Sequence, residues 1–206
     1  MNTQALHQYD LLIIGAGVSG AALLYLATKY SDIGSIGILE KYAAPARVNS
    51  LSSNNSQTLH RGGIETNYTL EKALKVKRAA LMLRNYAVAQ PDRHYIIDRY
   101  PKMVIGVGES ECELLRRRFD QFSPHYPKLR LLDRKAIAKI EPAVAMGDKG
   151  FRREKIIALG TTDEYCAVNF QALTLSFMRQ AKRLGREHPE KHVDINYKSC
   201  VRPRAC

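Results

Sequence analysis

The first forty residues alternate between apolar and glycine-rich stretches in an order that predicts two strands and a helix. Leu11 to Ile14 is a short apolar run, which is typical of a strand buried on both faces. The apolar segment from Ala21 to Ala27 is long enough for a helix, and Ile36 to Leu39 predicts a second strand that Glu40 follows. The pattern therefore indicates a strand–helix–strand nucleotide-binding unit.

Three glycines stand between the first strand and the helix, at the places where such a unit needs them. Gly15 permits a sharp turn, Gly17 permits backbone to approach a pyrophosphate, and Gly20 permits close packing of helix on strand. Free N–H groups at the helix N-terminus favour a negatively charged ligand there. The candidate pyrophosphate loop thus comprises Gly15, Ala16, Gly17, Val18, Ser19 and Gly20.

Glu40 ends the second strand and is placed to accept hydrogen bonds from a ribose diol. Its negative charge would repel a 2′-phosphate, so a phosphorylated adenosine is disfavoured. Because this carboxylate suits the ribose of FAD and that of NAD equally, spacing alone leaves both cofactors open. The glycine pattern by itself is a weak signal, and a structural glycine-rich turn is the alternative interpretation. Leu24 stands where such sequences often have Ala or Gly, so close packing is expected to rely on Ala21 and Ala22.

The remainder of the chain alternates between helical and extended patterns. Thr69 is expected to cap a helix that runs to about Ala89, and Ser110 with Glu113 resembles a capping box. Gly185 is expected to end the last helix as its C-cap. The further predicted elements are strands at 95–97, 103–107, 156–159 and 193–197, and helices at 110–122, from Asp133 to Pro142, and at 170–184.

A long polar loop, from Lys41 to about Thr66, separates the nucleotide unit from the next helix. Loops longer than about 15 residues in a compact domain are usually functional or disordered. We weigh contact with a cofactor or substrate against an ordinary surface loop, and favour contact because many hydrogen-bonding side chains lie here. His60 is the histidine in the most suggestive place, but a loop histidine and a catalytic one remain equally open.

Composition excludes several classes of protein. No apolar run reaches the length of a membrane span, and the first ten residues lack the features of a signal peptide. Four scattered cysteines, Cys112, Cys166, Cys200 and Cys206, indicate reduced cytosolic thiols, and we expect neither a disulfide framework nor a metal site. His188 and His192 are separated by Pro189, which favours a solvated loop over a ligand pair.

The net charge is +12, with the basic residues spread along the chain. We favour solvated helix faces over a nucleic-acid patch, because no nucleic-acid motif accompanies them, and expect no nucleic-acid partner. Peripheral contact with an anionic membrane surface stays open.

Four segments of the chain resemble one family, the flavin-dependent malate:quinone oxidoreductases. They read YDLLIIGAGVSGAALLYLATKY, ILEKY, NSQTLHRGGIETNYTLEKA and AVNFQALTLSFMRQAKRLG, and the resemblance extends from about Tyr9 to Tyr197. The family belongs to a wider group with D-amino acid oxidase and glycerol-3-phosphate dehydrogenase. The nucleotide motif is shared by many families, whereas the segment from Asn55 to Ala73 is more specific.

The resemblance implies an α/β (α+β overall) fold, in which a Rossmann-type FAD-binding domain is interrupted by an antiparallel-sheet substrate domain. We expect the FAD domain to begin in residues 1–90, the substrate domain in 91–165, and 166–206 to return toward the FAD domain. FAD is the implied cofactor. Carried onto this sequence, the family's cofactor contacts fall on Gly15 to Gly20, on Glu40 and Lys41 near the adenosine, and on Ser56, Gln57 and Thr58 near the flavin.

The resemblance also implies a reaction and a location. Family members oxidise (S)-malate to oxaloacetate, transfer the hydride to FAD and pass the electrons to a membrane quinone, in the tricarboxylic acid cycle. The implied partners are malate and the quinone, and the implied location is cytoplasmic, peripheral on the inner face of the cytoplasmic membrane. The resemblance identifies no catalytic residue in this sequence.

The end of the chain departs from the family. KSCVRPRAC loses the apolar alternation of the preceding strand, and we expect the chain to be an incomplete copy, with the C-terminal portion absent. Apolar helix faces and strand edges are then expected to lack partners. The alternatives are another FAD-dependent hydroxy-acid or amino-acid oxidoreductase of the group, a non-catalytic nucleotide-binding fragment, or a basic nucleic-acid-binding protein.

Overall fold

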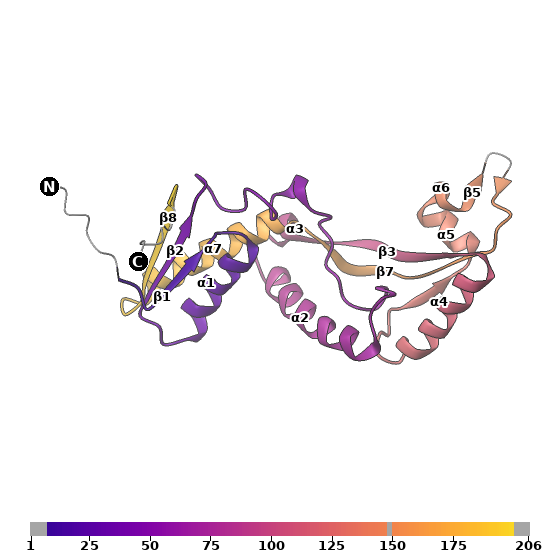
Figure 1. Ribbon diagram of the computed structural model, residues 1–206, viewed down its shortest axis with the longest axis horizontal. Coiled ribbons are helices and arrows are strands. Elements are labelled where there is room, and N and C mark those ends of the chain that lie inside the picture. Colours follow the sequence, from indigo (N-terminus) through magenta and orange to yellow (C-terminus); the bar gives the residue numbers. More distant parts are fainter. Residues whose placement is uncertain (1–7, 148–149, 200–206) are drawn as a thin grey trace, which may run out of the picture. The chain divides into compact units, whose positions relative to one another are not determined.

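The structure, a computed structural model, describes residues 8–147 and 150–199. The chain divides into two compact units. Unit 1 combines the N-terminal part, up to Gln57, with the C-terminal part from Asn169, and unit 2 is the continuous segment Thr58–Val168 between them. In Figure 1, unit 1 is drawn in indigo, purple and yellow, and unit 2 in magenta to orange. The expected interruption of one domain by another is therefore confirmed.

Unit 1 is built on a three-stranded parallel sheet with the order β1-β2-β8. Leu11 pairs with Ile36 across β1 and β2, and Ser35 pairs with His192 across β2 and β8. Figure 1 shows the sheet with the two long helices of the unit, which pack against each other. The elements are β1 (Leu11–Ile14), α1 (Val18–Tyr30), β2 (Ser35–Glu40), the 3-10 turn η1 (Ser52–Asn54), α7 (Phe170–Glu187) and β8 (His192–Tyr197).

The core of unit 1 lies between the sheet and its helices. Ile36 and Ile38 of β2 are fully buried, as are Ala21 and Leu24 of α1. Ala22 stays partly exposed, so close packing uses Ala21 and the larger Leu24 rather than two alanines. Burying a leucine side chain contributes about 1.5–3 kcal/mol, which makes this helix face a main source of stability.

Apolar side chains also remain exposed in unit 1. Leu12 and Ile14 of the edge strand β1 are 44% and 63% exposed. Leu23, Leu26 and Tyr30 lie on the outward face of α1 and are 46%, 43% and 69% exposed.

The last helix, α7, continues through Gly185 to Glu187, so the prediction of Gly185 as a C-cap was wrong. A Cβ on Gly185 would lie 2.9 Å from Val193 Cγ2 of β8. The glycine is therefore required for close contact between helix and strand. At the other end of the helix, the Asn169 side chain accepts a hydrogen bond from Ala172 N–H and supplies the N-cap.

Unit 2 contains a three-stranded antiparallel sheet with the order β3-β7-β4, together with a small hairpin of β5 and β6. Its two long strands, β3 and β7, pair along almost their whole length. The elements are α2 (Leu70–Val88), α3 (Arg93–Ile96), β3 (Ile97–Val107), α4 (Gly108–Phe122), β4 (Arg130–Leu132), α5 (Arg134–Ile140), α6 (Pro142–Ala145), β5 (Met146–Gly147), β6 (Gly150–Phe151) and β7 (Ile156–Val168).

Several predicted boundaries in unit 2 were wrong. Residues 95 and 96 belong to the short helix α3, and one strand, β3, replaces the two predicted strands. Register shifts at Asp98/Arg99 and Tyr100/Lys102 absorb the irregularity around Pro101 without ending the strand. The helix predicted from Ser110 begins at Gly108, and the Glu111 carboxylate accepts a hydrogen bond from Val107 N–H at 2.8 Å.

Helix α2 begins at the predicted N-cap, because the Thr69 side chain accepts a hydrogen bond from Lys72 N–H. The helix packs with unit 2: Ala73 joins Leu115, Phe122 and Leu159 in one core cluster. The unit boundary therefore falls at Gln57/Thr58, before this helix, rather than at the boundary near residue 90 that the sequence led us to expect. A second core cluster joins Ile137 and Ala145 to β7.

Among the helices of the described residues, none is long and apolar enough to cross a membrane.

Candidate nucleotide-binding site

The turn between β1 and α1 has the backbone geometry that its glycines predict. Gly15 has a positive φ of 96°, and its N–H donates to the Leu39 carbonyl at 2.7 Å. A Cβ on Gly20 would lie 2.0 Å from the Gly15 carbonyl oxygen, so no other residue fits there. A Cβ on Gly17 would meet only Ser50 Oγ, at 3.5 Å. Gly20 is thus fixed by packing, whereas Gly17 leaves open backbone beside the helix N-terminus.

Glu40 lies beside this turn and is only 8% exposed. One carboxylate oxygen accepts from Ala16 N–H at 2.7 Å, and the other accepts from Tyr42 N–H at 3.0 Å. These bonds fix the carboxylate next to the glycine turn. Each oxygen keeps further lone-pair capacity, which a ribose diol can use.

The loop after β2 folds back onto the turn. Ala46, with a φ of 58°, donates its N–H to the Ala16 carbonyl at 3.0 Å. Ser50 is buried, and its hydroxyl accepts from Val18 N–H at 2.9 Å, at the start of α1. The remaining N–H groups of the first helical turn have no intrahelical acceptor. Sequence reasoning missed Ser50, because it is one of many serines in an irregular loop.

A pocket of about 410 Å³ opens at this place. Lys41 and Arg47 bring positive charge to it, and Glu40 brings one carboxylate, so it is equipped for phosphate and for sugar hydroxyls. The lining is otherwise formed by the glycine turn and the folded-back loop. The full set is Ile14, Gly15, Gly17, Leu39, Glu40, Lys41, Tyr42, Ala46, Arg47, Val48, Asn49, Ser50 and Ser199.

The predicted flavin-side residues lie outside the lining of this pocket. Gln57 has a φ of 52°, and its side-chain oxygen accepts from Phe170 N–H at 3.0 Å, at the start of α7. Thr58 forms a β-bridge with Ala167 in unit 2. Asn54 and Asn55 donate to carbonyls of their own loop, at Val48 and at Asn49 and Leu51. These polar side chains hold the loop in shape, and Ser56 lies at its end in unit 1.

His60 belongs to a charged cluster in unit 2. Glu65 Oε1 is 2.9 Å from His60 Nδ1 and 3.0 Å from Lys102 Nζ. Burial raises the pKa of the Glu65 carboxyl, but the charge of Lys102 and the hydrogen bonds from Lys102 and His60 outweigh it, so the pKa lies below its ordinary value.

Arg118 holds the loop that carries this cluster. Its guanidinium donates to the carbonyls of Gly62, Gly63, Glu65 and Tyr68, at 3.2, 3.3, 2.7 and 3.0 Å. Burial lowers the pKa of Arg118.

The Tyr126 hydroxyl supports the same loop by donating a hydrogen bond to the Arg61 carbonyl at 3.1 Å. Burial, followed by the charge of Glu65, raises the pKa of Tyr126 to about 12. Arg61 also pairs with Glu164 at 2.9 Å, and both side chains are largely buried.

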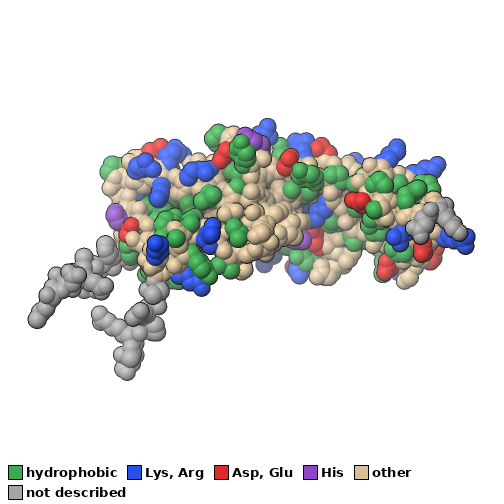
Figure 2. Space-filling model, turned by 90° about the horizontal axis from the view of Figure 1, so that it is seen from above, with side chains coloured by type: hydrophobic (Ala, Val, Ile, Leu, Met, Phe, Trp, Pro, Cys, Tyr) green, Lys and Arg blue, Asp and Glu red, His purple; other side chains and the backbone are tan. Residues whose placement is uncertain are grey.

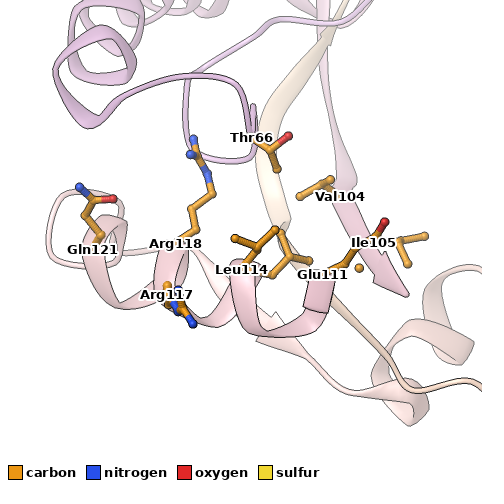
Figure 3. A pocket seen from close by; sticks show the side chains of 10 residues that line it. Thr66, Val104, Ile105, Glu111, Leu114, Arg117, Arg118 and Gln121 are labelled. Carbon is orange, nitrogen blue, oxygen red and sulfur yellow. The ribbon is translucent and has the colours of Figure 1, made fainter. Parts of the chain in front are cut away.

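A second pocket, of about 500 Å³, lies in unit 2. Figure 3 shows Thr66 of the loop, Val104 and Ile105 of β3, and Leu114 and Arg118 of α4 around it. The guanidinium of Arg118 is already hydrogen-bonded to the loop carbonyls, and the strand residues that line the pocket are apolar. We assign no catalytic group to this pocket.

In the ranges 8–147 and 150–199, no three His, Cys, Asp or Glu side chains lie close enough to hold a metal ion. Cys112 and Cys166 are buried free thiols, whereas Cys200 and Cys206 fall outside the described residues.

Two solved oxidases share the fold of this chain. L-α-glycerophosphate oxidase from Mycoplasma pneumoniae, solved with FAD bound, superposes with a TM-score of 0.65 at 16% identity, covering 94% of this chain and 45% of that one. Glycine oxidase from Bacillus cereus has a TM-score of 0.60 at 19% identity, covering 93% of this chain and 46% of the other. The fold class expected from the sequence is thus confirmed.

Sequence relatives are more specific. Residues 7–202 match the model of the malate:quinone oxidoreductase family. A probable malate:quinone oxidoreductase from Campylobacter jejuni is 39% identical over 91% of this chain, and the malate:quinone oxidoreductase from Helicobacter pylori is 38% identical over 93%. The chain spans 45% and 42% of the length of these two relatives. It belongs to the malate:quinone oxidoreductase family.

Proposed function

We propose that this chain forms the FAD-binding part of an enzyme that oxidises (S)-malate to oxaloacetate and passes the electrons to a membrane quinone, within the tricarboxylic acid cycle. Family membership supports the reaction, and the open backbone at Gly17 beside a charged, nucleotide-sized pocket supports the cofactor. The proposed location is cytoplasmic, peripheral on the inner face of the membrane, because the quinone is a membrane lipid.

The chain's own residues have distinct roles in holding FAD. Residues 15–20 would hold the pyrophosphate at the N-terminus of α1, and Glu40 with Lys41 would bind the adenosine ribose. Ser56, Gln57 and Thr58 are proposed for the flavin side. When bound, FAD supplies the acceptor for the hydride from malate.

Electrostatics supports FAD over a 2′-phosphorylated dinucleotide. The Glu40 carboxylate is fixed by two backbone N–H groups and is nearly buried, so it keeps its place when a ligand approaches. A ribose diol donates hydrogen bonds to such a group, whereas a phosphate is repelled by it.

A pair of glycine variants tests this site. Gly17→Ala leaves the fold intact, because the added Cβ meets only Ser50 Oγ at 3.5 Å, but it places a methyl group where the pyrophosphate approaches. Gly34→Ala is the matched control: its nearest contacts are also ordinary, at 3.5 and 3.7 Å, and it lies outside the pocket. In a titration followed by flavin absorbance and fluorescence, we expect at least a tenfold loss of FAD affinity for Gly17→Ala and no loss for Gly34→Ala.

Two outcomes count against the proposal. The nucleotide site is refuted if the parent chain binds no FAD, or if both variants bind it as the parent does. Malate is tested separately by anaerobic addition to a flavin-loaded full-length relative, where bleaching is expected with malate and not with glycine or L-proline.

A further inference from the structure

The small hairpin at one end of unit 2 presents an exposed apolar pair. Met146 of β5 and Phe151 of β6 are 40% and 48% exposed. They lie directly opposite each other in the antiparallel register, so their side chains project from the same face. A Met–Phe pair on a projecting hairpin buries little area within its own unit and is free to meet an apolar partner.

The base of this hairpin is firmly held. Ile137 of α5 and Ala145 of α6 are fully buried and pack with β7, and Arg152 N–H donates to the Ala145 carbonyl at 3.0 Å. Asp133 caps α5 by accepting from Ala136 N–H at 2.8 Å. The apolar pair is therefore presented by an ordered support.

Exposed cations lie close to the pair in the sequence. Arg152 and Arg153 follow Phe151 directly, and Lys135 and Lys139 are neighbours on one face of α5. In the described part of the chain none of these four cations forms an ion pair, and the exposed acids close in sequence are Asp133, Glu141 and Glu154. Figure 2 shows hydrophobic and basic side chains, with some acidic ones among them, at this end of unit 2.

We infer that the hairpin surface, defined as Met146, Phe151, Lys135, Lys139, Arg152 and Arg153, docks on an anionic lipid bilayer. The cations meet the headgroups, while the Met–Phe pair enters the boundary between headgroups and acyl chains. Charge complementarity favours this partner, because an apolar pair with unpaired cations directly after the hairpin and on α5 matches an anionic surface over an apolar layer. The inference rests on the proposed function, which requires the protein to meet a quinone in the membrane.

A single tryptophan reports on insertion directly, because the sequence contains none. Phe151→Trp should show a blue-shifted emission, quenched by brominated lipid, with vesicles of phosphatidylcholine and phosphatidylglycerol but not of phosphatidylcholine alone. Met82→Trp is the control, since Met82 is 71% exposed on α2 in the same unit and lies outside the hairpin surface. Its emission should not change.

Charge variants test the electrostatic part by vesicle co-sedimentation. Each Lys or Arg near an anionic surface strengthens binding by about fivefold, so Arg152→Gln with Arg153→Gln should weaken binding by about 25-fold. The same change at the half-buried Arg116 and the exposed Arg117 of α4 is the control and should have little effect. Met146→Ser with Phe151→Ser should weaken binding at least fivefold, while circular dichroism confirms the fold of each variant.

The inference is overturned if Phe151→Trp shows no lipid-dependent shift, or if both arginine pairs weaken binding equally. It is also overturned if replacing Arg152 and Arg153 abolishes dimer formation, measured by sedimentation velocity, or abolishes DNA binding. These measurements need neither flavin nor malate, so their failure is distinguishable from failure of the proposed oxidation.

Discussion

Replacing Arg118 by Met is expected to destabilise unit 2 strongly. The side chain donates to four backbone carbonyls of residues 62–68, and its guanidinium lies 3.8 Å from the centre of the Phe122 ring. Hydrogen bonds from a charged donor contribute about 1.5–3 kcal/mol each. Since such contributions are not additive and water reaches part of the loop after truncation, we expect a loss of about 3 kcal/mol rather than their sum.

The adjacent residue supplies the control. Arg117 lies on the same helix, is 73% exposed and pairs with Glu113 at 3.1 Å, an interaction worth about 0.3–0.5 kcal/mol. Arg118→Lys keeps the charge but loses the planar guanidinium. Its loss of unfolding free energy should therefore lie between the losses of Arg118→Met and Arg117→Met. The assay is urea unfolding followed by circular dichroism. If Arg118→Met and Arg117→Met lose the same free energy of unfolding, Arg118 does not organise the loop.

Three further predictions concern packing and pH. Gly20→Ala should prevent stable folding of unit 1, because its Cβ would lie 2.0 Å from the Gly15 carbonyl oxygen; thermal melts of soluble protein check this. The Glu65 pKa is lowered from 4.5, so its stabilising contribution is present above pH 4.5 and disappears as the pH falls through the folded value; Glu65→Gln should flatten acid unfolding curves. The Tyr126 pKa is raised from 10.0 to about 12, so stability should decline from pH 10 toward pH 12, and Tyr126→Phe should remove that decline in alkaline unfolding.

Each of these has a contrary result. A Gly20→Ala protein that melts like the parent would show that the turn relaxes freely. Unchanged acid unfolding in Glu65→Gln would mean that Lys102 and His60 do not favour the ionised carboxylate. An alkaline transition that persists in Tyr126→Phe would have to come from another group.

The nucleotide unit was predictable because its determinants are local. The apolar strand, the glycines and Glu40 stand within about thirty residues, and each acts on its neighbours. Contacts over longer separations were not predictable. Ser50 caps α1 from a loop 32 residues away, and Arg118 holds carbonyls some fifty residues distant, and no periodicity marks either position.

Strand boundaries failed for a related reason. Pro101 and Asp98 are turn-forming residues, yet β3 continues through them, because pairing with β7 on one side compensates for two register shifts. The role of Gly185 also depended on a partner, since Val193 of β8 decides whether a side chain fits. Local propensity is overruled where a distant strand supplies the contacts.

The insertion of unit 2 within unit 1 sets an order of events during synthesis. Ser35 of β2 pairs with His192 of β8, and Ser199 lines the nucleotide pocket, so neither the sheet nor the pocket is complete until the last part of the described chain has been made. Unit 2 is continuous and can fold while that part is still unmade. On a ribosome, β1 and β2 would emerge early and remain without β8. The nascent N-terminal segment is therefore the part of the chain most exposed to aggregation and to chaperone binding.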